Sequence, residues 1–359
     1  MANGEYVPGS YYFYAPNKGA PIFFTIAFFC TGAFHLYQNI KYHSLIRTIF
    51  FPFCSLLFTA GFALRIYGSH HFDDLNVYIA SICIIYAAPP LLELQNYNIL
   101  GRILYYVPYH SPIHPGRVLS TFAFISGIIE ALNGWGASLT ANQSLKQSTM
   151  DVGHILIKTA LLMQLAVAAC FLVLAGTFHR RCRANGIRDP RVQQPLCTLY
   201  ASMALIVVRT IYRVVEYFGV ASLRYADPDF DPTTMTPLIR YEWWFYVFEA
   251  SLMLINLVMM NVRHPRKWLP RSSDTYLAVD GVTEKDGPGW KDPAPFCKLS
   301  SIPLISSAWP RAAARGCPSF GWRMGSVVRK RRRAFESLIV RLEEFLVGTE
   351  ERWEGRGGY

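Results

Sequence analysis

Charged side chains are scarce in this sequence. Asp, Glu, Lys and Arg make up 16% of its 359 residues, whereas soluble domains carry about 25%. Hydrophobic residues make up 52%, and the mean hydropathy is +0.20. This composition argues against a soluble domain and indicates a membrane protein. The formal net charge of +11 does not indicate a nucleic-acid partner, because the basic residues lie in short clusters between apolar runs and near the C-terminus.

Motifs typical of several protein classes are missing. The chain contains no GxxxxGK[ST] sequence, which argues against ATP-driven pumping by this chain alone. No CxxC pair occurs, which argues against a zinc knuckle. The last apolar run has no lysine for a retinal Schiff base, and only His35 and His154 come near membrane depth, too few for a seven-span zinc hydrolase. Composition does not exclude a G-protein-coupled receptor, but LGRIL stands where its DRY-like motif would follow the third run.

Two histidines, His110 and His114, have the spacing of a metal-binding pair. Pro112 and Pro115 exclude the helix that would bring their side chains together, and no acidic residue or cysteine lies close by. We therefore interpret this segment as a rigid turn with interfacial tyrosines. We expect no metal site, no cofactor and no enzymatic activity.

Seven stretches are long and apolar enough to cross a bilayer, which takes roughly 20 residues for about 30 Å of hydrocarbon. They cover residues 21–40, 45–67, 77–100, 118–140, 154–178, 196–220 and 241–262. Because hydrocarbon supplies no water for unpaired backbone groups, each stretch should be helical. We predict an all-α membrane protein with seven transmembrane helices in one bundle.

The distribution of Lys and Arg predicts the orientation of the bundle. Most basic residues between the spans fall after the first, third, fifth and seventh spans, whereas the acidic loops HHFDDLN and ADPDFD fall on the other side. Since Lys and Arg mark the cytoplasmic side, the N-terminus should lie outside and the C-terminus in the cytoplasm.

Features of the predicted outer loops suggest passage through the secretory pathway. Asn142 begins the sequon Asn142-Gln143-Ser144, and we expect it to be glycosylated. None of the eight cysteines falls in an outer segment, so no structural disulfide is expected. The plasma membrane is the favoured location, with the vacuole and the endoplasmic reticulum as alternatives.

The composition divides the chain into three segments. Residues 1–20 form an outer N-terminal segment, residues 21–262 the transmembrane domain, and residues 263–359 a cytoplasmic tail in which Pro, Gly, Ser and charged residues predict disorder. Within the tail, apolar residues spaced three and four apart predict an amphipathic helix over residues 332–347. The preceding RKRRR suggests that this helix lies on an anionic leaflet; a solvated helix without a role is the alternative.

The sixth span contains the charged stretch RTIYRVVEY. At 100° per residue, Arg213 lies about 40° from Arg209, and Glu216 lies about 20° from Arg209 on the opposite side, so the three share one face. A charge at the bilayer centre costs about 2.5 to 3.5 kcal/mol on insertion scales, so such groups usually face the bundle interior and pair.

Polar side chains of the other spans are expected to meet this face. They are Arg65, Glu93, Gln95, Asn96, Glu130, Asn133, Gln164, Glu249 and Asn256. Three interpretations are open: a polar cavity for an amphipathic substrate, ion pairs that only fix helix register, and side chains that snorkel to an interface, for which Arg65 and Glu216 lie nearest the outer face. The cavity is favoured by AAPP at 87–90, which should break the third span, and by NGWG at 133–136, which should loosen the fourth.

Three stretches resemble, in order, motifs of the fungal lipid-translocating exporters. They are APPLLELQNYNILGR (88–102), VRTIYRVVEYFG (208–219) and the last span with its exit, YEWWFYVFEA to NVRHP (241–265). The resemblance covers roughly residues 11–270. Two places depart from the family's pattern: Thr59 and Phe62 stand where an acid and a tyrosine are usual, and Glu130 with Asn133 stands where an aspartate and a glutamine are usual.

The resemblance implies transport of amphipathic lipids or lipid-like toxins of the sphingoid-base, sterol-like or porphyrin classes. We predict that Arg209 and Arg213 bind an anionic or zwitterionic head group. The remaining site residues, as partners of the arginines or as a proton relay, are Glu216, Glu130, Asn133, Glu93, Glu249, Arg65 and Gln164. The expected partners are membrane lipids and an amphipathic small molecule, with no nucleic acid and no prediction of oligomeric state. The alternative is a seven-span sensor or regulator that acts through its cytosolic tail.

Overall fold

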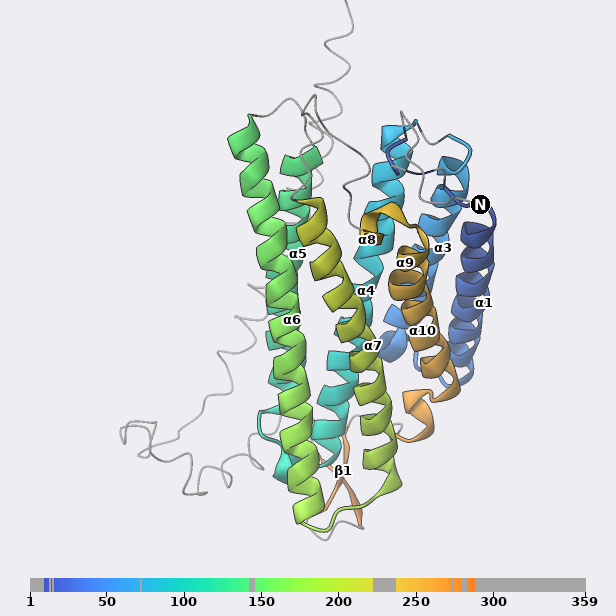
Figure 1. Cartoon of the computed structure of the whole chain (residues 1–359). Coiled ribbons are helices and arrows are strands. Elements are labelled where there is room, and N and C mark those ends of the chain that lie inside the picture. Colours follow the sequence, from blue (N-terminus) through green and yellow to red (C-terminus); the bar gives the residue numbers. More distant parts are fainter. Residues whose placement is uncertain are drawn as a thin grey trace, which may run out of the picture. The chain divides into compact units, whose positions relative to one another are not determined.

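The computed structural model describes residues 10–12, 14, 16–71, 73–141, 146–221, 237–270, 272, 274–278 and 283–287. It contains seven helices long and apolar enough to cross a membrane, and they form one bundle (Figure 1). The predicted fold, seven transmembrane helices in one bundle, is therefore confirmed.

The bounds of the helices differ from the predicted spans by up to seven residues. The elements are α1 (Gly19–Lys41), α2 (Leu45–Thr48), α3 (Phe50–Gly68), α4 (Leu75–Tyr106), η1 (Pro108–His110), α5 (Pro115–Ala141), α6 (Gln147–Ala184), α7 (Pro190–Val220), α8 (Pro237–Arg240), α9 (Trp243–Phe245), the π-helix η3 (Tyr246–Ser251), α10 (Leu252–Val262), η4 (Pro265–Lys267), β1 (Thr275–Leu277) and β2 (Glu284–Asp286). The seventh span runs through α9, η3 and α10.

Residues next to the spans fix where the helices begin and end. Asp74 caps α4, since its carboxylate accepts from the backbone N–H groups of Asn76 and Val77 at 2.9 and 3.3 Å. Asp189 caps α7 in the same way at 2.8 Å from the N–H of Arg191, with Pro190 at the first helical position. Gly186, with φ of +76°, supplies the left-handed residue after α6.

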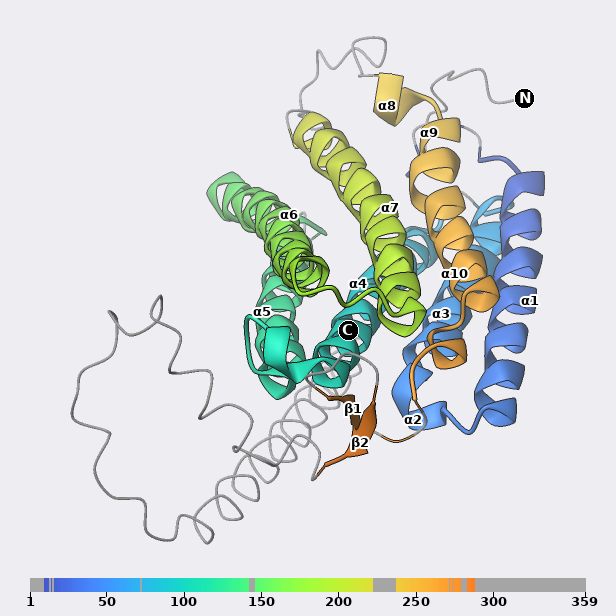
Figure 2. The ribbon, with the colours of Figure 1, turned by 90° about the horizontal axis from the view of Figure 1, so that it is seen from below.

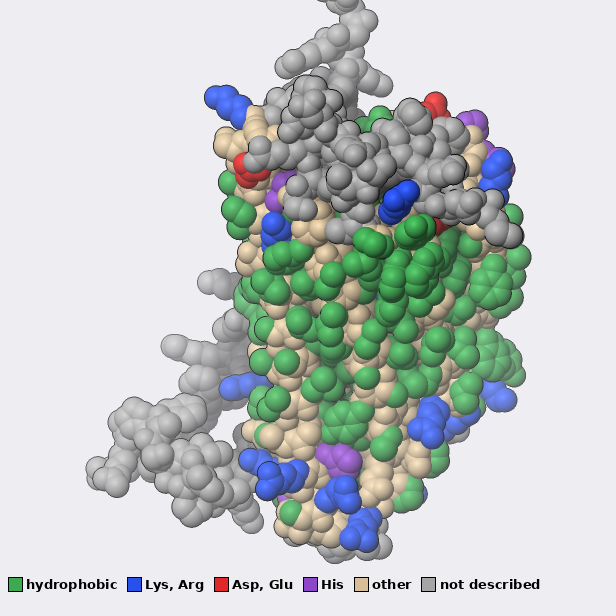
Figure 3. All heavy atoms as spheres, in the orientation of Figure 1, with side chains coloured by type: hydrophobic (Ala, Val, Ile, Leu, Met, Phe, Trp, Pro, Cys, Tyr) green, Lys and Arg blue, Asp and Glu red, His purple; other side chains and the backbone are tan. Residues whose placement is uncertain are grey.

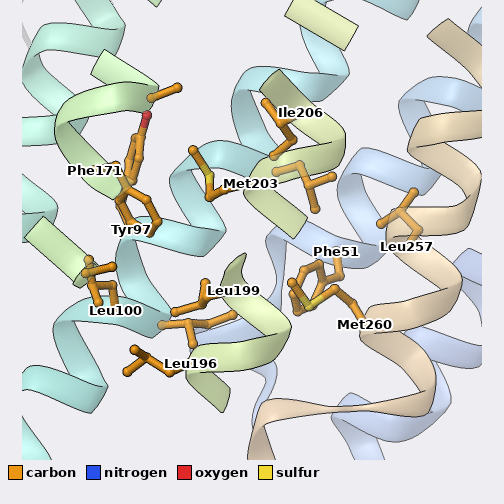
Figure 4. Close-up of a cluster of buried hydrophobic side chains, with 14 of the residues drawn as sticks. Phe51, Tyr97, Leu100, Phe171, Leu196, Leu199, Met203, Ile206, Leu257 and Met260 are labelled. Carbon is orange, nitrogen blue, oxygen red and sulfur yellow. The ribbon is translucent and has the colours of Figure 1, made fainter. Parts of the chain in front are cut away.

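The helix α4 contacts four of the other long helices, α6 least of them. It packs on α3, α5 and α7, while α10 lies between α1 and α7, as the view along the bundle shows (Figure 2). The core between them is apolar and aromatic: Phe51, Tyr97, Phe171, Met203 and Leu257 are among its side chains and come from five different helices (Figure 4). This packing carries the polar residues of α4, α7 and α10 into one interior.

The outward faces of the helices carry an apolar belt. Large hydrophobic side chains such as Phe23, Phe124, Trp135 and Val173 are 61 to 71% exposed, and in the space-filling view hydrophobic side chains cover the middle of the molecule, with Lys and Arg towards its ends (Figure 3). Exposed apolar surface of this extent and position fits lipid tails. The chain is an integral, multi-pass membrane protein; its orientation stays a prediction.

The predicted break in the third span is wrong. The helix α4 is continuous, with Pro89 and Pro90 inside it. Its neighbour α3 supports it at this point, because Cys54 Sγ donates to the carbonyl of Ala88 at 3.3 Å. Proline in a membrane helix is tolerated where neighbouring helices pack against the freed backbone.

The glycines of the fourth span serve close packing, and α5 is continuous through them. A Cβ on Gly136 would lie 2.6 Å from Ile157 Cγ1 and 2.8 Å from the carbonyl oxygen of Gly153, both on α6. By contrast, nothing lies within 4 Å of a Cβ on Gly134. Gly136 therefore lets α5 and α6 approach closely.

This contrast gives a matched pair of substitutions. Gly136→Ala should lower the free energy of unfolding by about 1–3 kcal/mol, the usual cost of overpacking. Gly134→Ala should leave it unchanged or raise it by up to about 1 kcal/mol, since alanine is the better helix former. Denaturation of the purified protein in mixed micelles measures both. Equal effects of the two substitutions would contradict the packing role of Gly136.

The beginning of the predicted tail folds back onto the bundle. Leu277 of β1 is 1% exposed within the core cluster. Glu284 of β2 accepts a hydrogen bond from the Tyr106 hydroxyl at 2.8 Å and forms an ion pair with Arg191 of α7. The segment predicted as a cytoplasmic tail, residues 263–359, thus contains η4 and the antiparallel strands β1 and β2, and the division of the chain into three segments stays a prediction. The predicted helix over 332–347 and the sequon at Asn142 lie outside the described residues.

Candidate functional site

The first charged group of the interior is the ion pair of Arg209 and Glu249. Arg209 Nε donates to both carboxylate oxygens of Glu249 at 2.9 and 2.8 Å, and Nη2 donates to Oε1 at 2.7 Å. The side chains are 4% and 0% exposed. Such a multiply hydrogen-bonded pair compensates two charges that would be costly alone in the core.

The backbone of the seventh span places Glu249 in this pair. Glu249 lies in the π-helix η3, which interrupts the α-helical ladder between α9 and α10. A short π-helix inside an α-helix contains one extra residue in its turn, which rotates the side chains before it relative to those after it. Such π-bulges are frequent at functional sites. The irregularity that sequence analysis placed in the third and fourth spans therefore lies in the seventh.

The second charged group lies one turn further along α7. Arg213 Nη1 donates to the Tyr86 hydroxyl at 2.7 Å and forms an ion pair with Glu216, and its guanidinium lies 3.8 Å from the centre of the Tyr86 ring. Tyr212 donates to the other oxygen of Glu216 at 3.1 Å. Arg213 and Glu216 are 13% and 15% exposed, so this pair is reachable from outside the bundle.

The third charged group is built on Arg65, which is 2% exposed and does not snorkel. Its Nη2 donates to Glu242 Oε1 at 2.9 Å, and the other carboxylate oxygen accepts from the backbone N–H of Asn17 at 2.8 Å. The guanidinium lies 4.3 Å from the centre of the Phe245 ring. The pair thus joins α3, the start of the seventh span and the segment before α1.

A tyrosine before α1 completes this third group. Arg65 Nη2 also donates to the Tyr14 hydroxyl at 3.3 Å. Burial raises the pKa of the Tyr14 phenol well above its ordinary value, so the hydroxyl is neutral and accepts the bond without adding a charge. Sequence analysis missed Glu242 and Tyr14. Glu242 could have been found as an acidic residue at the very start of an apolar span. No feature of the sequence distinguished Tyr14 as a site residue.

Two predicted acids have no ion-pair partner among the described residues. Glu93 is 2% exposed and accepts from Gln164 Nε2 at 2.8 Å and from the Tyr97 hydroxyl at 3.2 Å. Glu130 is half-buried on α5 and close enough to Arg209 for an electrostatic interaction, but it forms neither an ion pair nor a hydrogen bond within the described part of the chain. Asn133, also half-buried, makes no hydrogen bond there either.

The structure therefore brings together some of the predicted site residues and separates others. Arg209 meets Glu249, Arg213 meets Glu216, and Gln164 meets Glu93. Glu130 and Asn133 stand apart on α5, and Arg65 belongs to a separate group. Three neutral ion pairs and two further carboxylates leave the described interior with more acidic than basic side chains.

An apolar groove runs beside the second charged group. It has a volume of about 220 Å³ and lies between α7 and the segment from α8 to η3, lined by Val208, Ile211, Tyr212, Val215, Leu238, Trp244 and Phe248. Tyr212 belongs to both places, because its ring stacks on Phe248 at 5.5 Å and its hydroxyl donates to Glu216. A molecule with an apolar chain and a polar end would meet both kinds of surface here.

The chain is similar to several fungal proteins. The Lipid-translocating exporter-like protein RTA1 of Leptosphaeria maculans is 44% identical over 298 residues, which are 79% of this chain and 56% of the relative. A protein of the same name from Ajellomyces capsulatus is 30% identical over 62% of this chain and 68% of its own length. Protoporphyrin uptake protein 1 of Saccharomyces cerevisiae is 25% identical over 59% of this chain and 66% of its own length. The chain thus spans little more than half of the Leptosphaeria protein, and no solved structure matches it.

The comparison with protein families covers the part of the chain that holds the charged groups. Residues 51–272 match the family described as RTA1 like protein. This range includes nearly all of α3 and continues through α10, with Arg65, Arg209, Arg213 and the carboxylates that pair with them, and it is more than half of the chain. The chain is a member of the RTA1-like family of seven-span membrane proteins.

Proposed function

We propose that this protein moves amphipathic lipids, or lipid-like compounds of the sphingoid-base, sterol-like or porphyrin classes, across or out of the membrane. The head group would contact Arg213 and Glu216, and the apolar part would occupy the groove between α7 and η3. The relatives' names, which include Lipid-translocating exporter-like protein RTA1 and Protoporphyrin uptake protein 1, support this class of substrate.

The exposure of the three ion pairs separates binding from structural roles. The pairs of Arg209 and Arg65 have side chains that are 0 to 5% exposed, so a head group could not reach them without opening the bundle. The pair of Arg213 and Glu216 is 13% and 15% exposed. We therefore assign head-group contact to Arg213, and the fixing of helix positions to Arg65 and Arg209.

The observation that carries the proposal is the position of Glu216 between two kinds of surface. Tyr212 reaches it from the apolar groove and Arg213 reaches it from the side of α4, where Tyr86 lies. A zwitterionic or anionic head group could replace part of this network by offering its own oxygens to Arg213. The apolar chain of the lipid would pack against the apolar side chains of the groove, as bilayer lipids pack against the apolar outer surface of the bundle.

Leaflet exchange in proteoliposomes tests this assignment. Wild-type protein should speed the exchange of fluorescent phosphatidylcholine between leaflets, measured by quenching of the outer leaflet. Arg213→Ala should slow the protein-dependent rate by at least about tenfold, the effect of losing one charge-assisted contact. Arg188→Ala is the matched control, because Arg188 is an exposed arginine just before α7 with no ion pair among the described residues.

Two results would reject the assignment. Arg213→Ala protein that is folded by size-exclusion chromatography but exchanges lipid at the wild-type rate would remove Arg213 from the site. Equal slowing by Arg188→Ala would show a surface-charge effect instead.

The docked hairpin favours a second candidate, a sensor or regulator that acts through its tail. Glu284 bonds to Tyr106 on α4 and to Arg191 on α7, so the tail is connected to two helices of the polar interior. If wild-type protein gives no leaflet exchange in liposomes while deletion of residues 288–359 alters lipid efflux in cells, the regulator is the better description.

A further inference from the structure

Three polar side chains meet within the apolar core, around Ser202 of α7. Asn96 of α4 donates from Nδ2 to Ser202 Oγ at 2.8 Å, and Asn256 of α10 donates from Nδ2 to the backbone carbonyl of Ser202 at 3.3 Å. All three residues are 0% exposed. Their chain neighbours Tyr97, Met203 and Leu257 are part of the hydrophobic core (Figure 4).

The hydrogen-bond partners fix the orientation of the two amide groups. Asn256 faces a backbone carbonyl, which only accepts, so its nitrogen must point there. Asn96 Nδ2 lies 3.4 Å from Met203 Sδ as well as near Ser202, and sulfur is also an acceptor. Both Oδ1 atoms are buried and receive no hydrogen bond from any described residue. A buried carbonyl without a donor or a cation is unfavourable.

The charge nearby favours a cation over a neutral donor. Glu93 precedes Asn96 by one turn of α4, and its hydrogen-bond donors, Gln164 and Tyr97, are neutral. Within the described residues it has no ion pair. The polar groups at Ser202 are therefore acceptor oxygens, and the nearest carboxylate on α4 is that of Glu93, which Arg209 approaches closely enough for an electrostatic interaction. Neutral oxygens with a single carboxylate suit a monovalent ion, whereas Ca²⁺ and Mg²⁺ sites use more charge or several waters.

We propose that Asn96, Ser202 and Asn256 bind a monovalent cation of sodium size, through Asn96 Oδ1, Asn256 Oδ1 and Ser202 Oγ. Glu93 supplies the compensating charge from one turn away. The proposal goes beyond lipid translocation and does not depend on it, because binding of the ion requires no lipid.

Equilibrium binding of radioactive sodium to the purified full chain in detergent tests the site, with choline as the replacement cation. Wild-type protein should bind sodium saturably, and its thermal midpoint should rise with sodium but not with choline. Asn256→Leu should weaken sodium binding by at least about tenfold.

The matched control is Asn261→Leu. Asn261 lies on the same helix, is 5% exposed and also has an unpartnered amide oxygen, but its nitrogen bonds to Thr31 at the α1 interface. This control should bind sodium like the wild type. Asn256→Asp keeps an oxygen in place and adds a negative charge, so this variant should bind sodium more tightly than the wild type. It tests the site even if Asn256→Leu does not fold.

The proposal is overturned by any of three results: no saturable sodium binding by the wild type, equal binding by Asn256→Leu and Asn261→Leu, or an affinity unchanged by Asn256→Asp.

Discussion

Replacing Arg209 with methionine should lower the free energy of unfolding by about 3–5 kcal/mol. The substitution leaves the Glu249 carboxylate, 0% exposed, without the guanidinium that donates three hydrogen bonds to it. An unpaired buried charge costs more than the pair itself contributes, because the desolvation of the remaining ion is no longer offset. Denaturation in mixed micelles of increasing denaturing detergent measures the effect.

The double variant Arg209→Met with Glu249→Leu is the control for this prediction. It removes both charges and keeps similar volumes, so most of the stability should return. Arg209→Lys should fall between, because lysine cannot make the forked contact. A double variant as unstable as Arg209→Met alone would show that packing around Arg209, and not the uncompensated carboxylate, accounts for the loss.

Replacing Glu242 with glutamine should also cost about 3–5 kcal/mol, since it strands the buried guanidinium of Arg65. The loss should be visible locally as well. Glu242 accepts from the backbone N–H of Asn17, and Arg65 donates to Tyr14, so the segment before α1 is held by this group. Hydrogen exchange at residues 16–19 should become faster in the variant than in the wild type.

The control for Glu242 is the same substitution in an exposed ion pair. Glu284 pairs with Arg191, and their side chains are 35% and 51% exposed. Glu284→Gln should change the free energy of unfolding by no more than about 1 kcal/mol, because water screens the pair. If the two substitutions cost the same, or if exchange at Asn17 is unchanged in Glu242→Gln, the buried group does not hold the N-terminal segment.

The three ion pairs that the structure describes inside the bundle thus divide by access. Two are sealed in the bundle and should govern stability, and one opens beside an apolar groove and is the candidate for head-group contact. The predictions for Arg209 and Arg213 are therefore opposite in kind: loss of stability for the first, and loss of lipid exchange in folded protein for the second.

The number and positions of the spans could be predicted from the sequence because they depend on local averages. A stretch of about 20 apolar residues must become a helix in hydrocarbon, whatever its neighbours are. The periodicity of α7 also predicted one shared face for Arg209, Arg213 and Glu216; Arg209 and Arg213 have partners on η3 and α4, whereas Glu216 bonds to residues of α7 itself. Local patterns were less reliable for the backbone: Pro89 and Pro90 did not break α4, and Gly136 packs against α6.

The partners of the charged residues needed the tertiary structure. Arg209 had several acids within plausible reach, including Glu130 and Glu93, and it pairs with Glu249, which is 40 positions away. The choice depends on the rotation of the seventh span, and the π-helix at Tyr246–Ser251 sets that rotation without any signature in the sequence. Arg65 was expected near an interface and is instead buried against Glu242.

Hydrophobicity and helical period act over a few turns, so the amino-acid sequence was enough to predict a seven-helix membrane protein with ionisable residues inside. The pairing of each acid with its arginine, the accessibility of each pair and the lack of a donor for the amide oxygens around Ser202 among the described residues could be read only from the folded chain. These outcomes depend on the distances between helices far apart in the chain, and a periodicity fixes the face of one helix but not what lies opposite it.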